Sequence, residues 1–212
     1  MKRSQAGFTL IEIAIVLVII GLLLGGVLKG QALIDSAKVK NLAEDFRNVP
    51  VFVFSYQDKY KALPGDDTGV TSHLSGATLA TTPASNQGNG AINGNWNSST
   101  TTDETFLLWQ HVRLAGLTQG ATSTAATNYL PRNTLGGALG VSATTPITGL
   151  KGVHFVCSDA IPGKYAAELD IALDDGNTAT GGMMTTTLGT TTAAAAITAP
   201  AADTTYLVCM GF

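Results

Sequence analysis

Apolar residues dominate the start of the chain. Between residues 8 and 28 the only charged side chain is Glu12. As a helix this run would span about 31 Å, close to the roughly 30 Å hydrocarbon core of a bilayer. Lys2 and Arg3 precede it, and the positive-inside rule places basic residues on the cytoplasmic side. The pattern predicts one membrane-spanning helix with its start in the cytoplasm.

The hydrophobic pattern then becomes periodic. Apolar residues recur every three or four positions with charged residues between them, which is typical of one apolar stripe along a helix. The stripe consists of Val39, Leu42, Phe46, Val49, Val53, Tyr56 and Tyr60. We therefore expect a helix over residues 8–60, with a membrane and assembly segment at 8–28 and an outer half whose stripe is covered by a head domain.

After Pro64 and Gly65 the composition changes to Thr, Ser, Asn and Gly, and residues 66–105 are interpreted as exposed loops. The stretch "NQGNGAINGNWN" contains spaced glycines, but neither the lysine nor the strand-to-helix context of a phosphate-binding loop accompanies it. We expect an ordinary loop here.

The stretch "DETFLLWQHVRLAGL" predicts a short helix. Thr102 or Asp103 is a suitable N-cap, and Gly116 a suitable end. His111 within it is interpreted as a surface or core-edge residue rather than a ligand.

Two later stretches, "GVHFVCS" and "TTYLVCMGF", are rich in β-branched and aromatic residues and predict strands. Between them, residues 178–205 are mostly Thr and Ala, with too little apolar bulk to fold alone. The chain is predicted to be α+β, with a long N-terminal helix packed on a small antiparallel-sheet head formed by residues 61–212.

Glu12 is the unusual residue of the apolar run. Placing a carboxylate at hydrocarbon depth costs at least a few kcal/mol of free energy unless a positively charged group pairs with it. A secretory signal cut after Ala32 is an alternative, but the apolar run exceeds the usual length of a signal core. A second alternative is a plain single-pass membrane anchor in which the Glu12 side chain extends to the membrane–water interface.

The residues "GFTLIE" resemble the cleavage and methylation motif of type IV pilins and of the pseudopilins of type II secretion systems. The resemblance implies that a prepilin peptidase cuts between Gly7 and Phe8, removes a leader of residues 1–7 and methylates the new amine of Phe8. It also implies that Glu12 of one subunit neutralises the Phe8 amine of its neighbour, and that the fold is type IV pilin-like.

The same resemblance implies partners and a location. The precursor would lie in the inner membrane with a cytoplasmic N-terminus, and would meet the inner-membrane pilus or secretion assembly machinery there. Assembled, the chain would form a homo-oligomeric helical filament at the cell surface. A pseudopilin of a type II secretion system and a monomeric membrane-anchored binding module remain alternatives.

The two cysteines are Cys157 and Cys209. In a head outside the cytoplasm they are expected to form one disulfide closing residues 157–209, which resembles the carboxy-terminal disulfide loop of type IV pilins. Two free buried thiols are the alternative.

Several functional classes find little support in the sequence. The three histidines are scattered and no catalytic motif occurs, so we expect no enzyme. Residues 61–212 contain fewer basic than acidic residues, so no nucleic-acid patch is evident.

The stretch "LDIALDDGNTATGG" is the one cluster of possible metal ligands. Asp170, Asp174, Asp175 and Asn177 offer oxygen atoms suited to calcium. Their spacing differs from that of an EF-hand, and a turn at Asp-Gly explains them without a metal. Apart from this calcium possibility, no cofactor is expected.

Overall fold

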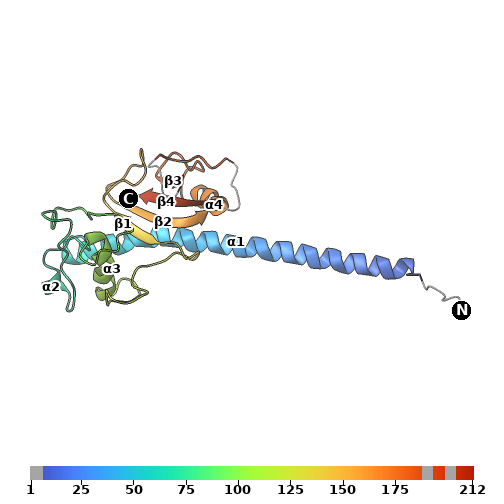
Figure 1. Ribbon diagram of the computed structural model, residues 1–212, viewed down its shortest axis with the longest axis horizontal. Helices are drawn as coiled ribbons and strands as arrows, with labels where there is room; N and C mark the ends of the chain where they lie inside the picture. Colours follow the sequence, from blue (N-terminus) through green and yellow to red (C-terminus); the bar gives the residue numbers. More distant parts are fainter. Residues whose placement is uncertain (1–6, 188–192, 199–203) are drawn as a thin grey trace. The chain divides into compact units, whose positions relative to one another are not determined.

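The computed structural model describes residues 7–187, 193–198 and 204–212 of the 212-residue chain. Its elements are α1 (Leu10–Tyr60), α2 (Val70–His73), α3 (Glu104–Leu114), β1 (Leu139–Ser142), β2 (Phe155–Pro162), α4 (Gly163–Leu173), β3 (Met183–Thr187) and β4 (Thr205–Gly211) (Figure 1). A long N-terminal helix followed by a small antiparallel sheet confirms the predicted α+β, pilin-like architecture. The chain divides into two compact units, residues 1–38 and 39–212.

In the first unit, α1 exposes apolar side chains on all sides. Leu10, Leu22 and Leu28 have 93%, 73% and 66% of their surface exposed. Among the described residues, α1 is the one helix long and apolar enough to cross a membrane. Most of the predicted leader, residues 1–6, lies outside the described residues.

In the second unit, the rest of α1 supplies one wall of the core. The predicted stripe is confirmed, because every member from Val39 to Tyr56 is buried and Tyr60 is half-buried. The stripe shares one hydrophobic cluster with α3 and with sheet residues such as Val141, Val156 and Val208. The periodicity along the helix thus identifies the face that packs on the head.

The sheet has four strands in the order β1-β2-β4-β3, and every neighbouring pair is antiparallel (Figure 1). Successive side chains of a strand point to opposite faces. In β4, Val208 therefore joins the α1 cluster, whereas Leu207 and Cys209 join a second, smaller cluster with Ile147 and Phe155. Both faces of the sheet are covered, which explains why its central strands are so apolar.

The predicted short helix is α3. Asp103 occupies the N-cap position, but its carboxylate makes no cap hydrogen bond and instead accepts hydrogen bonds from the hydroxyls of Ser98 and Thr82. Residues 104–113 are all buried. Asp103 thus fixes the preceding loop rather than the helix end.

The interpretation of residues 66–105 as exposed loops is wrong in part. Asp66, Val70 and Ile92 are buried. The backbone amides of Gly88 and Gly90 donate hydrogen bonds of 2.5 and 2.8 Å to the Asp66 carboxylate. The amides of the glycine-rich loop therefore bind the chain's own Asp66 side chain.

Candidate functional site

Glu12 has a local partner that sequence reasoning missed. Its Oε2 accepts hydrogen bonds from the amide of Thr9 at 2.8 Å and from the Thr9 hydroxyl at 2.7 Å. In return, the Glu12 amide donates to the Thr9 hydroxyl at 3.3 Å. This is the capping box of a helix N-terminus, and the T-x-x-E spacing was the signal that pointed to it.

The capping box uses only one oxygen of the Glu12 carboxylate, Oε2. The Glu12 side chain is exposed in the isolated chain. A cation supplied by another molecule can therefore approach Oε1 without breaking the cap. The local role and the role between subunits are compatible.

The predicted processing site lies just before this cap. Gly7 is exposed with no side chain packed against it, and Phe8 has 85% of its surface exposed. The peptide bond between them precedes the first helical residue, Leu10. A peptidase would therefore meet exposed backbone outside the helix at this bond.

The comparisons with known proteins identify this segment. Residues 2–28 match the family model of the prokaryotic N-terminal methylation motif. No curated protein and no solved structure matches the chain.

The matched segment is the type IV pilin and pseudopilin signature, and it supports a type IV pilin-like or pseudopilin-like protein. The motif implies processing by a prepilin peptidase and assembly into a pilus or a secretion machinery. With the exposed apolar helix, it is consistent with a membrane-anchored precursor.

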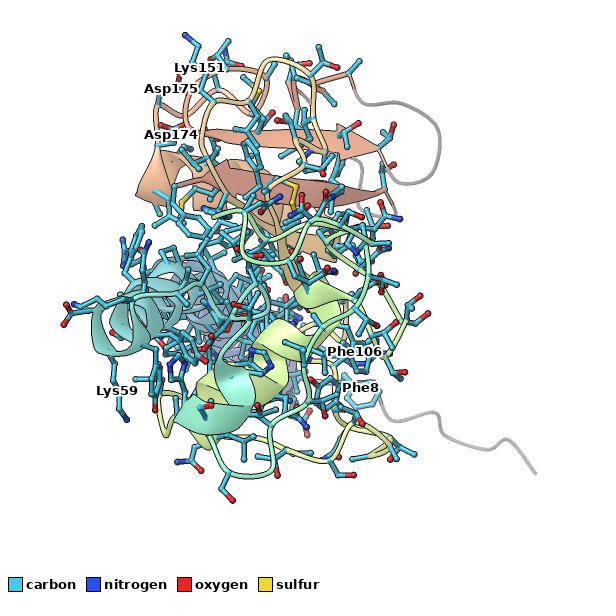
Figure 2. The ribbon with its side chains drawn as sticks, turned by 90° about the vertical axis from the view of Figure 1, so that its left-hand side faces the viewer. Phe8, Lys59, Phe106, Lys151, Asp174 and Asp175 are labelled. Carbon is cyan, nitrogen blue, oxygen red and sulfur yellow. A yellow bond between two sulfur atoms is a disulfide. The ribbon has the colours of Figure 1, made fainter. Side chains whose placement is uncertain are left out.

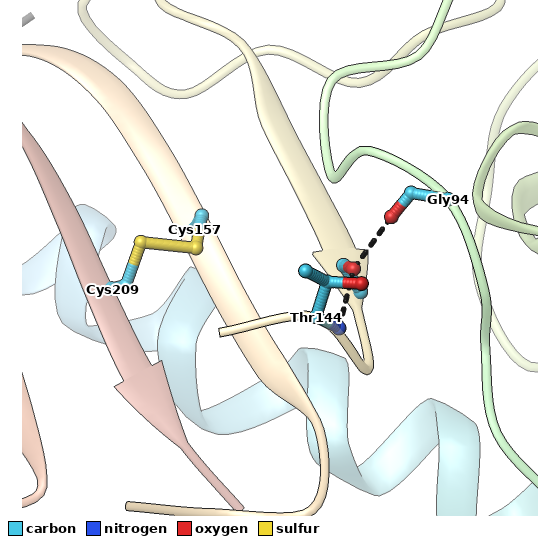
Figure 3. The surroundings of a disulfide bond; sticks show 5 residues. Gly94, Thr144, Cys157 and Cys209 are labelled. Carbon is cyan, nitrogen blue, oxygen red and sulfur yellow. Dashed lines mark hydrogen bonds between the residues drawn. A yellow bond between two sulfur atoms is a disulfide. The ribbon is translucent and has the colours of Figure 1, made fainter. Parts of the chain in front are cut away.

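In the head, Cys157 and Cys209 form a disulfide (Figure 3). They lie directly opposite each other on the neighbouring strands β2 and β4. Both are fully buried in the cluster on the sheet face away from α1. The bond therefore joins the two strands that enclose α4 and β3 in the sequence.

Near the disulfide, β1 is linked to the loop before α3. The Ser142 hydroxyl donates to the carbonyl oxygen of Gly94 at 2.6 Å and accepts from the amide of Thr144 at 2.8 Å (Figure 3). These bonds fasten the loop to the edge strand.

Buried polar groups organise the loops around the end of α1. The Asp67 carboxylate accepts a 2.8 Å hydrogen bond from the Tyr56 hydroxyl and pairs with Nδ1 of His73 at 2.7 Å. His111 is fully buried, so its interpretation as a surface or core-edge residue is wrong. Its Nδ1 accepts from the amide of Gly65 and its Nε2 donates to the carbonyl of Thr78, both at 2.9 Å.

Burial lowers the pKa of His111, and the bonds to Gly65 and Thr78 complement a neutral ring. The imidazole thus connects two loops as a fixed donor and acceptor. No nucleophile in the described residues is bonded to it.

Three of the four predicted metal ligands come together where α4 ends. Asp170 lies in the last turn of α4, and Asp174 is its C-cap. One oxygen from each of Asp170, Asp174 and Asp175 lies within 4.8 Å of those of the other two. Asp170 is fully buried. Asp174 and Asp175, labelled in Figure 2, are exposed.

The environment of Asp170 resists ionisation. Burial, together with the negative charges of Asp174 and Asp175, raises the pKa of Asp170 to about 6, and the nearby amide of Gly176 opposes this rise. Neither Asp170 oxygen has a hydrogen-bond partner among the described residues.

The fourth predicted ligand, Asn177, builds the adjoining turn. Its Oδ1 accepts a hydrogen bond of 3.2 Å from the amide of Ala179, and its own amide donates to Oδ1 of Asp175 at 2.8 Å. Asn177 therefore positions Asp175.

Proposed function

We propose that this protein is a structural subunit of an extracellular helical filament, a type IV pilin, that assembles through its N-terminal helix. The methylation motif carries the proposal, because it includes an exposed helix segment whose one charged residue between positions 8 and 28 is Glu12. Such a surface has to be covered by lipid in the precursor and by other helices after the subunit leaves the membrane. A catalytic role is not part of the proposal.

Cleavage between Gly7 and Phe8 would create a positively charged amine that can pair with the Glu12 carboxylate. The new amine of Phe8 remains basic after methylation, and packing among neighbouring helices takes it out of water. A buried pair of this kind adds little stability over an apolar substitute, but removing one member strands a charge at about 3–5 kcal/mol. Pairing of Glu12 with the Phe8 amine of a neighbour would thus set the register between subunits.

In this proposal the chain has the domain organisation expected from its sequence. The leader, residues 1–7, is removed by the prepilin peptidase on the cytoplasmic side. Residues 8–60 form the helix, and residues 61–212 form a head outside the inner membrane. The disulfide across β2 and β4 supports this placement, because disulfides persist in oxidising compartments.

Mass spectrometry of the amino terminus tests the processing step. Filaments sheared from cells that express the protein are expected to contain chains that begin with N-methylated Phe8. A terminus at Leu33, directly after Ala32, would identify a secretory signal and overturn the proposal. Processed chains confined to the membrane fraction, with none in sheared filaments, would favour a pseudopilin.

A further inference from the structure

The head contains a cavity of about 250 Å³. Its lining comes from the outer half of α1, from α3 and from the loops between α3 and β1, and it includes Asp45, Arg113 and Arg132. All the lining residues belong to the compact unit of residues 39–212. The volume is just below the roughly 300–1,000 Å³ of pockets that bind drug-sized ligands. An occupant of this cavity would therefore be a small molecule.

Arg113 brings a buried positive charge to the cavity. Only 9% of its surface is exposed. Its Nη1 donates to the carbonyl oxygens of Ala121 at 2.9 Å and Tyr129 at 2.6 Å, whereas its Nε is buried without a partner. No carboxylate of the described residues pairs with it. Because carbonyl oxygens carry no net charge, the guanidinium charge is not neutralised, and a buried charge without a counter-charge costs free energy.

The surroundings of Arg113 hold its guanidinium in one place. Its Cζ lies 5.9 Å from the ring centre of Trp109 and 5.3 Å from that of Tyr129, within the range of cation–π attraction. The backbone of Gly120 packs so closely that a Cβ there would lie 2.5 Å from Nε. The N–H groups of Nη2 have no hydrogen-bond partner among the described residues. A fixed guanidinium with such N–H groups is suited to bind a carboxylate.

Asp45 brings the opposite charge from α1. It is half-buried and lines the same cavity. Burial, with a smaller contribution from Glu44, raises the pKa of Asp45 to about 6, so the carboxyl group is mostly ionised at neutral pH. No basic side chain in the described part of the chain pairs with it. Asp45 and Arg113 therefore line one cavity without forming an ion pair with each other.

We propose that this cavity binds a free α-amino acid with an apolar side chain, whose carboxylate pairs with Arg113 and whose ammonium group pairs with Asp45. A simple anion would leave Asp45 unpaired, and a simple cation would leave Arg113 unpaired. A molecule that carries both charges compensates both groups. Phe52 and Trp109 also line the cavity and offer an apolar wall to the side chain of the ligand. This inference goes beyond the proposed function and does not depend on it, since one head supplies the whole site.

Calorimetric titration of the full chain in detergent near neutral pH tests the proposal. The titrants are L-leucine, L-valine and L-phenylalanine, which differ in size, and two analogues of leucine that each lack one charge. The analogues are 4-methylpentanoate, which lacks the ammonium group, and 3-methylbutylamine, which lacks the carboxylate. We expect one of the amino acids to bind saturably, one molecule per chain. For leucine, each analogue should bind at least about tenfold more weakly, because it leaves one protein charge unpaired.

Two variants and one control assign the site. Arg113→Gln and Asp45→Asn should each weaken binding of the amino acid at least about tenfold. Asp45→Asn should bind 4-methylpentanoate as well as the wild type does, or better, because it removes the charge that repels an anion. A purely structural effect of this substitution would weaken both ligands equally. Glu44→Gln removes the neighbouring exposed carboxylate, which lies outside the lining, and should bind as the wild type does.

Arg113 also fastens the loop after α3, so Arg113→Gln is the variant that could fail to fold. Asp45→Asn then decides the question, because Asp45 has no hydrogen-bond or ion-pair partner among the described residues. No saturable binding of any of the three amino acids by the wild type would overturn the proposal. Equal weakening of the amino acid and of 4-methylpentanoate by Asp45→Asn, or no weakening of either, would also overturn it.

Discussion

At the scale of single residues, two buried acids of the head, Asp66 and Glu104, accept hydrogen bonds from backbone amides. Asp66 receives three amides, from Gly88, Asn89 and Gly90. Oε2 of Glu104 receives the amide of Asn93 at 2.6 Å and its side-chain nitrogen at 3.1 Å. These donors replace the hydrogen bonds to water that each carboxyl group loses on burial.

Only one of the two carboxyl oxygens of Glu104 has hydrogen-bond partners. Its Oε1 is buried without a partner, and burial, with smaller contributions from Asp66 and Asp103, raises its pKa to about 7 although Asn93 opposes the shift. The folded head therefore holds this proton more tightly than the unfolded chain, in which the carboxyl group has its ordinary pKa of about 4.5. The resulting stabilisation is complete below pH 4.5 and is lost as the pH rises through 7.

The prediction concerns Glu104→Gln, which keeps the acceptor for Asn93 but cannot ionise. The free energy of unfolding of the wild type should fall between pH 5 and pH 8 by about 1–3 kcal/mol more than that of the variant. Chemical denaturation at several pH values measures both. Parallel pH profiles for the two proteins would show that Glu104 does not titrate in this range.

Several residue roles were hidden in the sequence for an identifiable reason. The partners of Asp66 and His111 lie more than twenty residues away along the chain, so no local pattern indicates them. The partner of Glu12 is different, because Thr9 stands three positions before it. That pair was predictable from the capping-box spacing.

At the scale of elements, the disulfide sets the stability of the carboxy-terminal region. Cys157 and Cys209 are 52 residues apart. Closing a loop of this length restricts the unfolded chain by about 4 kcal/mol on the chain-entropy model. Within this loop, residues 178–205 are mostly Thr and Ala, so they offer few apolar contacts that could replace this restriction.

Replacing both cysteines by alanine should therefore lower the free energy of unfolding by about 2–5 kcal/mol. Chemical denaturation of the purified chain in detergent, with and without reductant, measures the change. The reductant should destabilise the wild type and leave the double variant unaffected. A double variant as stable as the oxidised wild type would show that packing alone holds the two strands together.

Long, strongly periodic or strongly apolar elements were predictable, and small polar ones were not. The stripe on α1 and the apolar runs of β2 and β4 predicted those elements well. β3 is made of two Met and three Thr, and pairing with β4 rather than its own composition makes it a strand. α4 buries small residues such as Gly163 and Ala166, which give a weak hydrophobic period.

At the scale of the whole molecule, the two compact units differ in whether they bury their own apolar side chains. The unit of residues 39–212 buries its own core. The apolar surface of the unit of residues 1–38 remains exposed and requires an outside partner. Glu12 is the one charged side chain of its membrane segment, and it has two candidate partners, Thr9 of its own chain and the Phe8 amine of a neighbour.

Three variants separate these partners. Glu12→Gln keeps the capping box, because glutamine also accepts from the N-cap amide, but it removes the charge. Glu12→Ala removes both. Thr9→Ala removes the hydroxyl of the cap and leaves the charge of Glu12 in place. All three retain Gly7 and the apolar helix, so membrane insertion and cleavage should be unchanged.

The most direct measurement is electron microscopy of filaments sheared from cells that express each variant, beside an immunoblot of the membrane fraction. Glu12→Gln and Glu12→Ala should both be present and cleaved in the membrane but form few filaments, because the packed Phe8 amine is left unpaired at several kcal/mol per subunit. Thr9→Ala should still assemble. Abundant filaments from Glu12→Gln would contradict the account and reduce Glu12 to a local helix cap.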